Sequence, residues 1–137
     1  MHDPSAPPTV VFVCAHGAVK SVVAAAYLQR LAEQRGLSLR ATAAGLEPDP
    51  EVPAAVAEHL LADGIDVRGY RPRGVTRGEL STAWRIVTFG CDLGGLASPG
   101  RPVLRWDDVP SLSEDFAAGR AAITAHLDTA FLDWRLP

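Results

Sequence analysis

The chain has 137 residues, of which 47% are hydrophobic and 21% charged, with a formal net charge of −3 at pH 7. This composition is typical of a soluble globular protein, and the length suffices for one domain with a buried core. The negative charge argues against nucleic acids or acidic membranes as general partners, and no apolar run reaches the length of a membrane span.

The first nine residues lack the charged and apolar regions of a signal peptide. We expect residues 1–9 to form a flexible tail and residues 10–137 to form a single domain. A cytoplasmic location is expected, where the two cysteines stay reduced unless they work as a redox pair.

An apolar, β-branched run at residues 10–13 predicts a strand that stops at Cys14. A short loop with one glycine, Gly17, follows, and Lys20 and Ser21 then open an alanine-rich segment with helical spacing. A helix N-terminus carries unpaired N–H groups and a partial positive charge, so it binds anions, and a cysteine placed there tends to ionise to the nucleophilic thiolate. The stretch therefore predicts a thiolate within an oxyanion-binding loop.

The next segments alternate between helix and strand. Apolar residues at helical spacing predict a first helix over residues 21–35, with Gly36 as its stop, and a second strand is expected over residues 37–43. Pro53 suits the first turn of a second helix that Gly64 closes. Three apolar residues are expected on the inner face of that helix: Val56, Leu60 and Leu61.

The second half of the chain predicts an irregular loop over residues 68–78 and a short helix that Thr76 and Glu79 open with a capping box. The run at residues 84–89 predicts a strand buried on both faces, and a last short strand is expected over residues 103–106.

A flexible loop is expected at residues 94–99 and a turn at residues 107–110. Residues 113–115 should open a final helix. Four apolar residues are expected on its inner face: Phe116, Ile123, Leu127 and Phe131.

Strands that alternate with helices imply an α/β fold of three layers: a four-stranded parallel sheet with helices on both faces and right-handed crossovers. Ligands of such sheets bind at the carboxyl ends of the strands. Several candidate residues fall at these ends, which predicts one site there: Cys14, Gly45, Cys91, Asp107 and Asp108.

Cysteine, five residues, a basic residue and then serine, between a first strand and a first helix, resembles the low-molecular-weight protein-tyrosine phosphatases and the related thioredoxin-coupled arsenate reductases. In that superfamily the pattern is cysteine, any five residues, arginine, and serine or threonine. Residues 43–48 and 53–67 also resemble family segments, and the likeness covers residues 10–134. The resemblance implies a low-molecular-weight phosphatase-like fold and, as partner, a phosphate-like oxyanion or phosphorylated substrate.

Carried over by position, the resemblance makes Cys14 the nucleophile and Ser21 a hydrogen-bond partner of its thiolate. The backbone amides that would hold the oxyanion belong to Ala15, His16, Gly17, Ala18, Val19 and Lys20. Lys20 stands where the family has arginine, and His16-Gly17 stands where glycine-asparagine is usual. Arginine binds two oxygens with one planar fork, whereas lysine is a point charge. Lys20 is the only lysine, beside twelve arginines, which suggests that it is selected.

Each of these residues also has a structural alternative. Cys14 is compatible with a buried core thiol, Lys20 with a solvated first-turn lysine and Ser21 with an N-cap. A cation at a helix N-terminus is unfavourable without an anion to offset it, which favours anion binding by Lys20. His16 either contributes a donor or a charge to the loop or points to water.

The general acid implied by the resemblance is an aspartate directly before proline, on the loop after the last strand and near a tryptophan. Trp106 is present, but Val109 intervenes before Pro110. Asp108 is therefore the preferred acid and Asp107 the second choice, with an acidic turn that caps the next helix as the alternative.

The stretch that ends in Cys91-Asp92 resembles the arsenate reductase segment whose second cysteine attacks the first after arsenite leaves. Cys91 would be this resolving thiol, shifted one place, and no third cysteine follows at residues 93–99. An outside thiol reductant would then complete a two-cysteine cycle.

No metal or cofactor is expected, because the cysteines and histidines show no ligand spacing. Three histidines are expected in the tail or on helix surfaces: His2, His59 and His126.

Three hypotheses follow from the sequence. The first is hydrolysis of a phosphate monoester by Cys14. We expect its rate with Lys20 to be lower by a factor of about a hundred or more than the rate with arginine at this position. The second is arsenate reduction with Cys91 as the resolving thiol. The third is a catalytically altered anion-binding protein, or a cysteine enzyme that acts on a non-phosphate electrophile.

Overall fold

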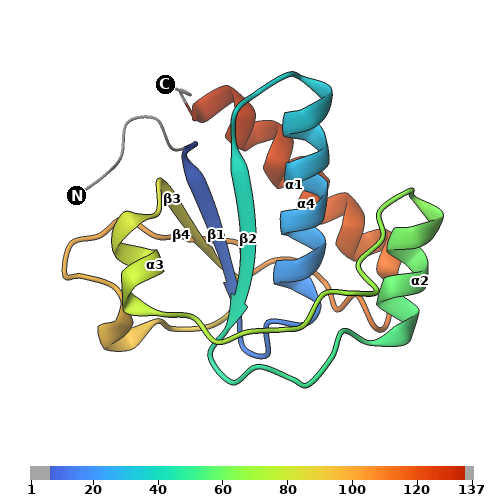
Figure 1. Ribbon diagram of the computed structural model, residues 1–137, viewed down its shortest axis with the longest axis horizontal. Helices are drawn as coiled ribbons and strands as arrows, with labels where there is room; N and C mark the ends of the chain where they lie inside the picture. Colours follow the sequence, from blue (N-terminus) through green and yellow to red (C-terminus); the bar gives the residue numbers. More distant parts are fainter. Residues whose placement is uncertain (1–6, 135–137) are drawn as a thin grey trace.

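The computed structural model describes residues 7–134, which form a parallel sheet of four strands with helices on both faces (Figure 1). The strands are β1 (Thr9–Cys14), β2 (Arg40–Gly45), β3 (Arg85–Thr88) and β4 (Leu104–Arg105). The helices are α1 (Lys20–Gln34), α2 (Ala54–Ala62), α3 (Arg77–Thr82), the short 3-10 helix η1 (Gly94–Leu96) and α4 (Phe116–Asp133). None of these helices is long and apolar enough to cross a membrane.

The order of the strands places β1 near the centre of the sheet. The order is β2-β1-β3-β4, and every neighbouring pair is parallel. Cys14 lies opposite Gly45 in the register, and Val13 lies opposite Thr88. Because parallel strands end at the same edge of a sheet, the loops after β1, β2 and β3 are neighbours. The predicted fold class, a three-layer α/β fold, is confirmed.

Alternate residues of β1 contribute to two hydrophobic cores on opposite faces of the sheet. Val10 and Phe12 belong to the core that α1, α2 and α4 cover, and Val11 and Val13 belong to the core beneath α3. Figure 1 shows α3 and the short η1 on one side of the sheet and α1, α2 and α4 on the other. These four side chains are at most 1% exposed, so the unbroken apolar run of β1 reflects burial on both faces.

The element boundaries differ from the expected ones by a few residues. The strand β2 begins at Arg40 because the N–H of Leu37 still donates to the carbonyl of Ala32 at the end of α1. The capping box of Thr76 and Glu79 is present at α3. The loop expected over residues 94–99 contains η1, and β4 is an exposed edge strand of two residues.

The two ends of the expected domain fall partly outside the described residues. Of the tail expected over residues 1–9, residues 1–6 lie outside the described part, and β1 already begins at Thr9. At the other end Asp115 caps α4, and Phe131 is half-buried with the guanidinium of Arg35 over its ring.

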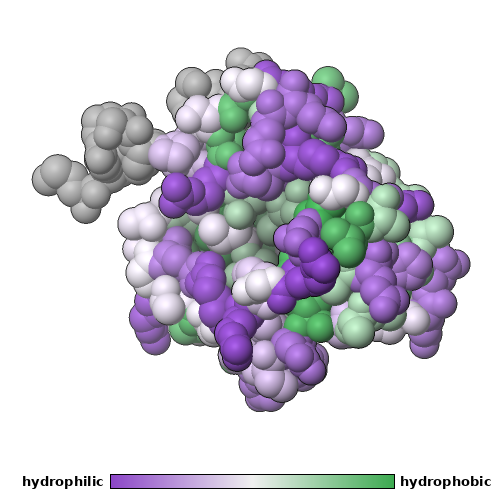
Figure 2. Space-filling model, turned by 45° about the vertical axis from the view of Figure 1, so that its right-hand side comes forward, coloured by the Kyte–Doolittle hydropathy of each residue, from purple (hydrophilic) through white to green (hydrophobic). Residues whose placement is uncertain are grey.

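The expected position of Leu61 on the inner face of α2 is wrong. Val56 and Leu60 are one helical turn apart and are buried, whereas Leu61 lies about 100° further around the helix and is 41% exposed. Leu61 lines a surface pocket together with Val52 and Val67. Hydrophilic residues cover most of the face shown in Figure 2, with smaller apolar patches between them.

The loop after β1 lies directly on the turn after β2, backbone against backbone. Gly17 has a φ of +60°, a conformation that other residues rarely adopt. A Cβ atom on Gly17 would lie 2.6 Å from the backbone nitrogen of Gly45, and a Cβ atom on Gly45 would lie 2.5 Å from that of Gly17. Neither position has room for a side chain, and this close approach holds the two loops together.

We expect Gly17→Ala to lower the free energy of unfolding by about 3 kcal/mol, because overpacking and a left-handed backbone both oppose the new methyl group. The matched control is Gly36→Ala. Gly36 has a φ of +65° but nothing within 4 Å of its would-be Cβ, so only the backbone term of about 1 kcal/mol applies. Urea unfolding measures both changes, and equal losses would contradict the close approach of the two loops.

Candidate active site

Cys14 is the last residue of β1, and its thiol is buried against the first turn of α1. The Sγ atom lies 3.0 Å from the Oγ atom of Ser21, and Ser21 is fully buried. Ser21 is not the N-cap, since α1 begins at Lys20 and the capping position is Val19, which makes no side-chain cap bond. The hydroxyl of Ser21 therefore contacts the sulphur and does not cap the helix, and either atom can donate in this hydrogen bond.

The carbonyl groups of the loop after Cys14 are tied to the segment that follows β2. The N–H groups of Leu46, Glu47 and Asp49 donate to the carbonyls of Cys14, Ala15 and His16, at 3.2, 2.8 and 3.0 Å. Within the described part of the chain, no hydrogen bond uses the N–H groups of residues 15–19 as donors. A loop whose acceptors are occupied and whose donors are free has the polarity of an anion-binding site.

The charges at the start of α1 reinforce this polarity. Lys20 is the first residue of the helix and is half-buried, and the first turn holds no acidic residue. Among residues 7–134, no carboxylate lies within ion-pair distance of Lys20. The positive end of the helix and the ammonium group therefore lack a counter-charge, which an anion would supply.

His16 is turned toward the segment after β2. Its Nδ1 atom lies 3.2 Å from the carbonyl oxygen of Glu47 and 3.5 Å from a carboxylate oxygen of Asp49, and the side chain is 60% exposed. These contacts give His16 a role in tethering the loop to residues 47–49 and not that of a donor at its centre.

The structure places the two candidate acids in the loop after β4, each with a partner of its own. Asp107 accepts from the N–H of Gly90 at 2.8 Å and from Arg105 at 3.1 Å, and these two bonds, the first more than the second, hold its pKa below the usual value. The imidazole of His126, 2.7 Å from Asp108, lowers the pKa of that carboxyl. Both groups are exposed carboxylates in this structure, and neither bonds to the Cys14 loop among the described residues.

His126 is a residue of this site that the sequence reasoning missed. It was expected on the surface of the last helix, but its ring stacks on Trp106 with centroids 4.7 Å apart and planes 8° apart, while its Nε2 atom reaches Asp108. Its position, three residues after the buried Ile123, was the only signal in the sequence that placed it near the inner face.

Cys91 lies close to Cys14 although 77 positions separate them in the sequence. Its Sγ atom donates to the carbonyl oxygen of Val13, the residue that precedes Cys14, at 3.5 Å. Both thiols are free and buried. Burial raises the pKa of the Cys91 thiol, so it is protonated at neutral pH in this state.

The structure thus places Cys91 against the residue that precedes Cys14, but Cys91 belongs to the core beneath α3 and Cys14 to the core on the other face of the sheet. Asp107 and Asp108 are engaged with other partners. The described residues contain no group of three side chains that could hold a metal ion.

Comparison with solved structures gives two groups of relatives. The thioredoxin-dependent arsenate reductase Cg_ArsC1' of Corynebacterium glutamicum is 25% identical with a TM-score of 0.73, over 96% of this chain and 66% of that one, so the chain spans just under two thirds of its length. The low molecular weight protein tyrosine phosphatase of T. tengcongensis is 16% identical with a TM-score of 0.82, over 93% of this chain and 99% of that one. An arsenate reductase in the phosphate binding state is 14% identical with a TM-score of 0.73, over 92% and 98% of the two chains.

No curated protein sequence matches the chain. The family model of low molecular weight phosphotyrosine protein phosphatase matches residues 9–92, which run from the first residue of β1 to the residue after Cys91. This match includes the whole Cys14 loop, and the parallel sheet agrees with the solved phosphatase structure. The chain therefore belongs to the low molecular weight phosphotyrosine protein phosphatase family.

Proposed function

We propose that the Cys14 loop binds a tetrahedral oxyanion and that the protein hydrolyses a phosphate monoester through a cysteinyl-phosphate. One observation carries this proposal: the carbonyls of the loop are bonded away from its centre while its N–H groups are free, next to a buried thiol that Ser21 contacts. The phosphate-bound state of a structural relative supports a phosphate-like ligand. We also propose a cytoplasmic location, since the mechanism needs the Cys14 thiol reduced.

In the first step the Cys14 sulphur attacks phosphorus, the bond from phosphorus to the alcohol oxygen breaks, and the alcohol leaves with a proton. The amides of residues 15–19 and the ammonium group of Lys20 bind the three outer oxygens, where negative charge develops. Water then attacks the phosphorus of the cysteinyl-phosphate, which releases phosphate and returns the thiol of Cys14.

The leaving alcohol takes its proton from an aspartic acid of the loop after β4, with Asp108 preferred and Asp107 second. Both carboxylates have a lowered pKa in this structure, and a general acid must carry a proton when substrate is bound. A bound dianion raises the pKa of a nearby carboxyl, so this carboxyl would take up its proton when the substrate binds.

Hydrolysis of an aryl phosphate should depend on Cys14 and improve with an arginine at position 20. We expect Cys14→Ser to lower kcat by a factor of about 10³ or more, because the hydroxyl is a far weaker nucleophile than a thiolate. Lys20→Arg should raise kcat/KM about tenfold or more by adding a bidentate contact. Steady-state kinetics of the purified variants measure both effects.

Background turnover in both the parent and Lys20→Arg would overturn this proposal. If phosphate still raised the Tm in that case, the protein would bind anions without catalysis, as the third hypothesis states.

The identity of the general acid can be tested with two leaving groups. We expect Asp108→Asn to slow hydrolysis of an alkyl phosphate about 10²-fold, because the alcohol needs a proton, and to leave p-nitrophenyl phosphate almost unaffected. Asp107→Asn is the matched control. A larger effect of Asp107→Asn on the alkyl phosphate would reverse the assignment, and no effect of either variant would remove the acid from this loop.

Arsenate reduction is the second candidate, and the contact between Cys91 and Val13 favours it. Cys14 would displace hydroxide from arsenate and form a sulphur–arsenic bond. The thiolate of Cys91 would then attack the Cys14 sulphur, so that arsenic leaves as arsenite with the electron pair of that bond and a disulfide forms. An external dithiol would reduce the disulfide.

For this reaction we expect arsenate to cause the loss of two free thiols and the appearance of a Cys14–Cys91 disulfide by mass spectrometry. The rate should rise from neutral to alkaline pH, because burial raises the pKa of Cys91 and only its thiolate attacks. Cys91→Ala should abolish arsenate reduction and retain hydrolysis of the aryl phosphate. Arsenate reduction by Cys91→Ala at the parental rate would exclude Cys91 as the resolving thiol.

A further inference from the structure

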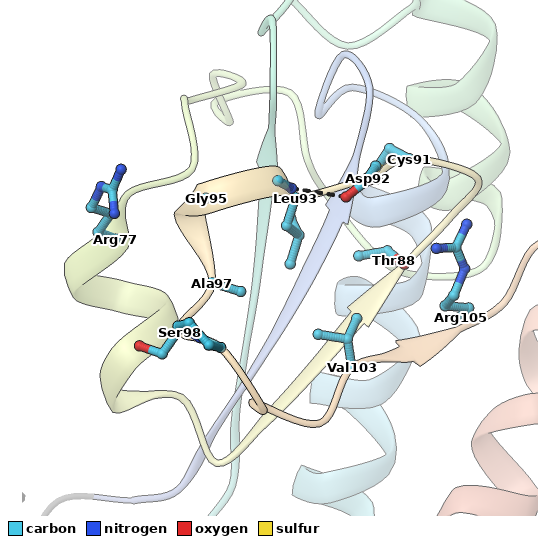
Figure 3. A pocket seen from close by; sticks show the side chains of 12 residues that line it. Arg77, Thr88, Cys91, Asp92, Leu93, Gly95, Ala97, Ser98, Val103 and Arg105 are labelled. Atoms are coloured by element: carbon cyan, nitrogen blue, oxygen red, sulfur yellow. Dashed lines mark hydrogen bonds between the residues drawn. The ribbon is translucent and has the colours of Figure 1, made fainter.

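A pocket lies beside the end of β3, on the side of the sheet that α3 covers (Figure 3). Its volume is about 620 Å³, within the roughly 300–1,000 Å³ typical of small-molecule sites. Its walls are the loop of residues 91–99, the end of β4 and the first residue of α3, and no residue of the Cys14 loop lines it. The pocket therefore lies beside the site described above and shares Cys91 with it.

Two arginines give the pocket its charge. Figure 3 shows Arg77 at one side of the pocket and Arg105 at the other, projecting from α3 and β4. Arg77 has no ion pair among the described residues, and Arg105 pairs with the exposed Asp107. The one acidic side chain of the lining, Asp92, already accepts the N–H of Gly94 at 2.8 Å. Arg77 is therefore the arginine of the lining whose charge has no ion-pair partner among the described residues.

The floor of the pocket contains an unpaired polar group. Thr88 lines the pocket and is 1% exposed, and its Oγ1 atom is buried without a hydrogen-bond partner. A buried hydroxyl without a partner destabilises the folded state. Rotation about the Cα–Cβ bond of Thr88 exchanges its methyl and hydroxyl groups and presents the hydroxyl to an occupant of the pocket.

The remaining walls are largely apolar, with Leu93, Ala97 and Val103 among them. We propose that this pocket is a second ligand site, which binds a small organic anion with its charged group toward Arg77 and its apolar part against Leu93 and Val103. Thr88 donates or accepts one hydrogen bond to the occupant. Ligand binding at this site does not depend on whether Cys14 hydrolyses phosphate esters or reduces arsenate.

Binding of benzoate, with the isosteric but uncharged benzamide as its control, tests this proposal. We expect benzoate to shift the methyl NMR signals of Thr88, Leu93 and Val103 with saturation, and benzamide to bind at least tenfold more weakly (roughly) because it lacks the charge. Equal binding of the two compounds, or shifts confined to the Cys14 loop, would overturn the proposal.

Two variants with matched controls identify the residues. Arg77→Gln should weaken benzoate binding about tenfold, whereas Arg71→Gln, which removes an exposed arginine outside the pocket, should leave it unchanged.

Thr88→Val should raise the Tm of the free protein, because the unpaired hydroxyl is removed, and weaken benzoate binding about fivefold. Thr42→Val is the control, since its Oγ1 atom is also buried and unpaired but lies outside the pocket. Thr42→Val should raise the Tm of the free protein and retain the parental affinity for benzoate. Parental affinity in Thr88→Val, or a fall in its Tm, would remove Thr88 from the site.

Discussion

The close approach of two backbones, at Gly17 and Gly45, is the constraint on which the site depends. The loop after β1 lies so near the turn after β2 that three of its carbonyls bond to N–H groups of residues 46–49. A peptide group whose carbonyl is fixed on one side presents its N–H on the other. The polarity of the loop thus follows from how it is packed, and the side chains within it contribute little.

The electrostatic character of the loop follows from the start of α1. The buried Ser21 contacts the sulphur, and Lys20 adds a full charge to the partial charge of the helix end. No carboxylate balances these charges among residues 7–134, so the site is arranged for a ligand that brings its own negative charge. Lysine satisfies this need for charge but not the geometry of a bidentate clamp.

The two proposed reactions would share this loop, and they would depend on different neighbours. Ester hydrolysis needs a proton from the loop after β4, where His126 and Gly90 now hold the two aspartates as anions. Arsenate reduction would need the thiol of Cys91, whose pKa burial raises and which donates to the carbonyl of Val13, the residue before Cys14. Hydrolysis would therefore require one of these carboxyls to gain a proton, and arsenate reduction would require Cys91 to lose one.

Much of the fold was readable from the sequence by itself, because the signals are local. The apolar run that ends at Cys14, the capping box of Thr76 and the alternation of strands with helices determined the α/β class and placed Cys14 at a helix start. The spacing of Cys14, Lys20 and Ser21 also indicated the loop, since anion binding by main-chain amides depends on chain geometry over a few residues.

Only the tertiary structure decided which distant groups meet. Periodicity along one chain does not encode how elements pack, and three features depend on that packing. They are the contact of Cys91 with Val13, the hydrogen bond between His126 and Asp108, and the exposure of Leu61. The same is true of Gly45, whose lack of a side chain matters because a different loop lies against it. Local interactions set the elements of this protein, and long-range packing set the partners of its reactive groups.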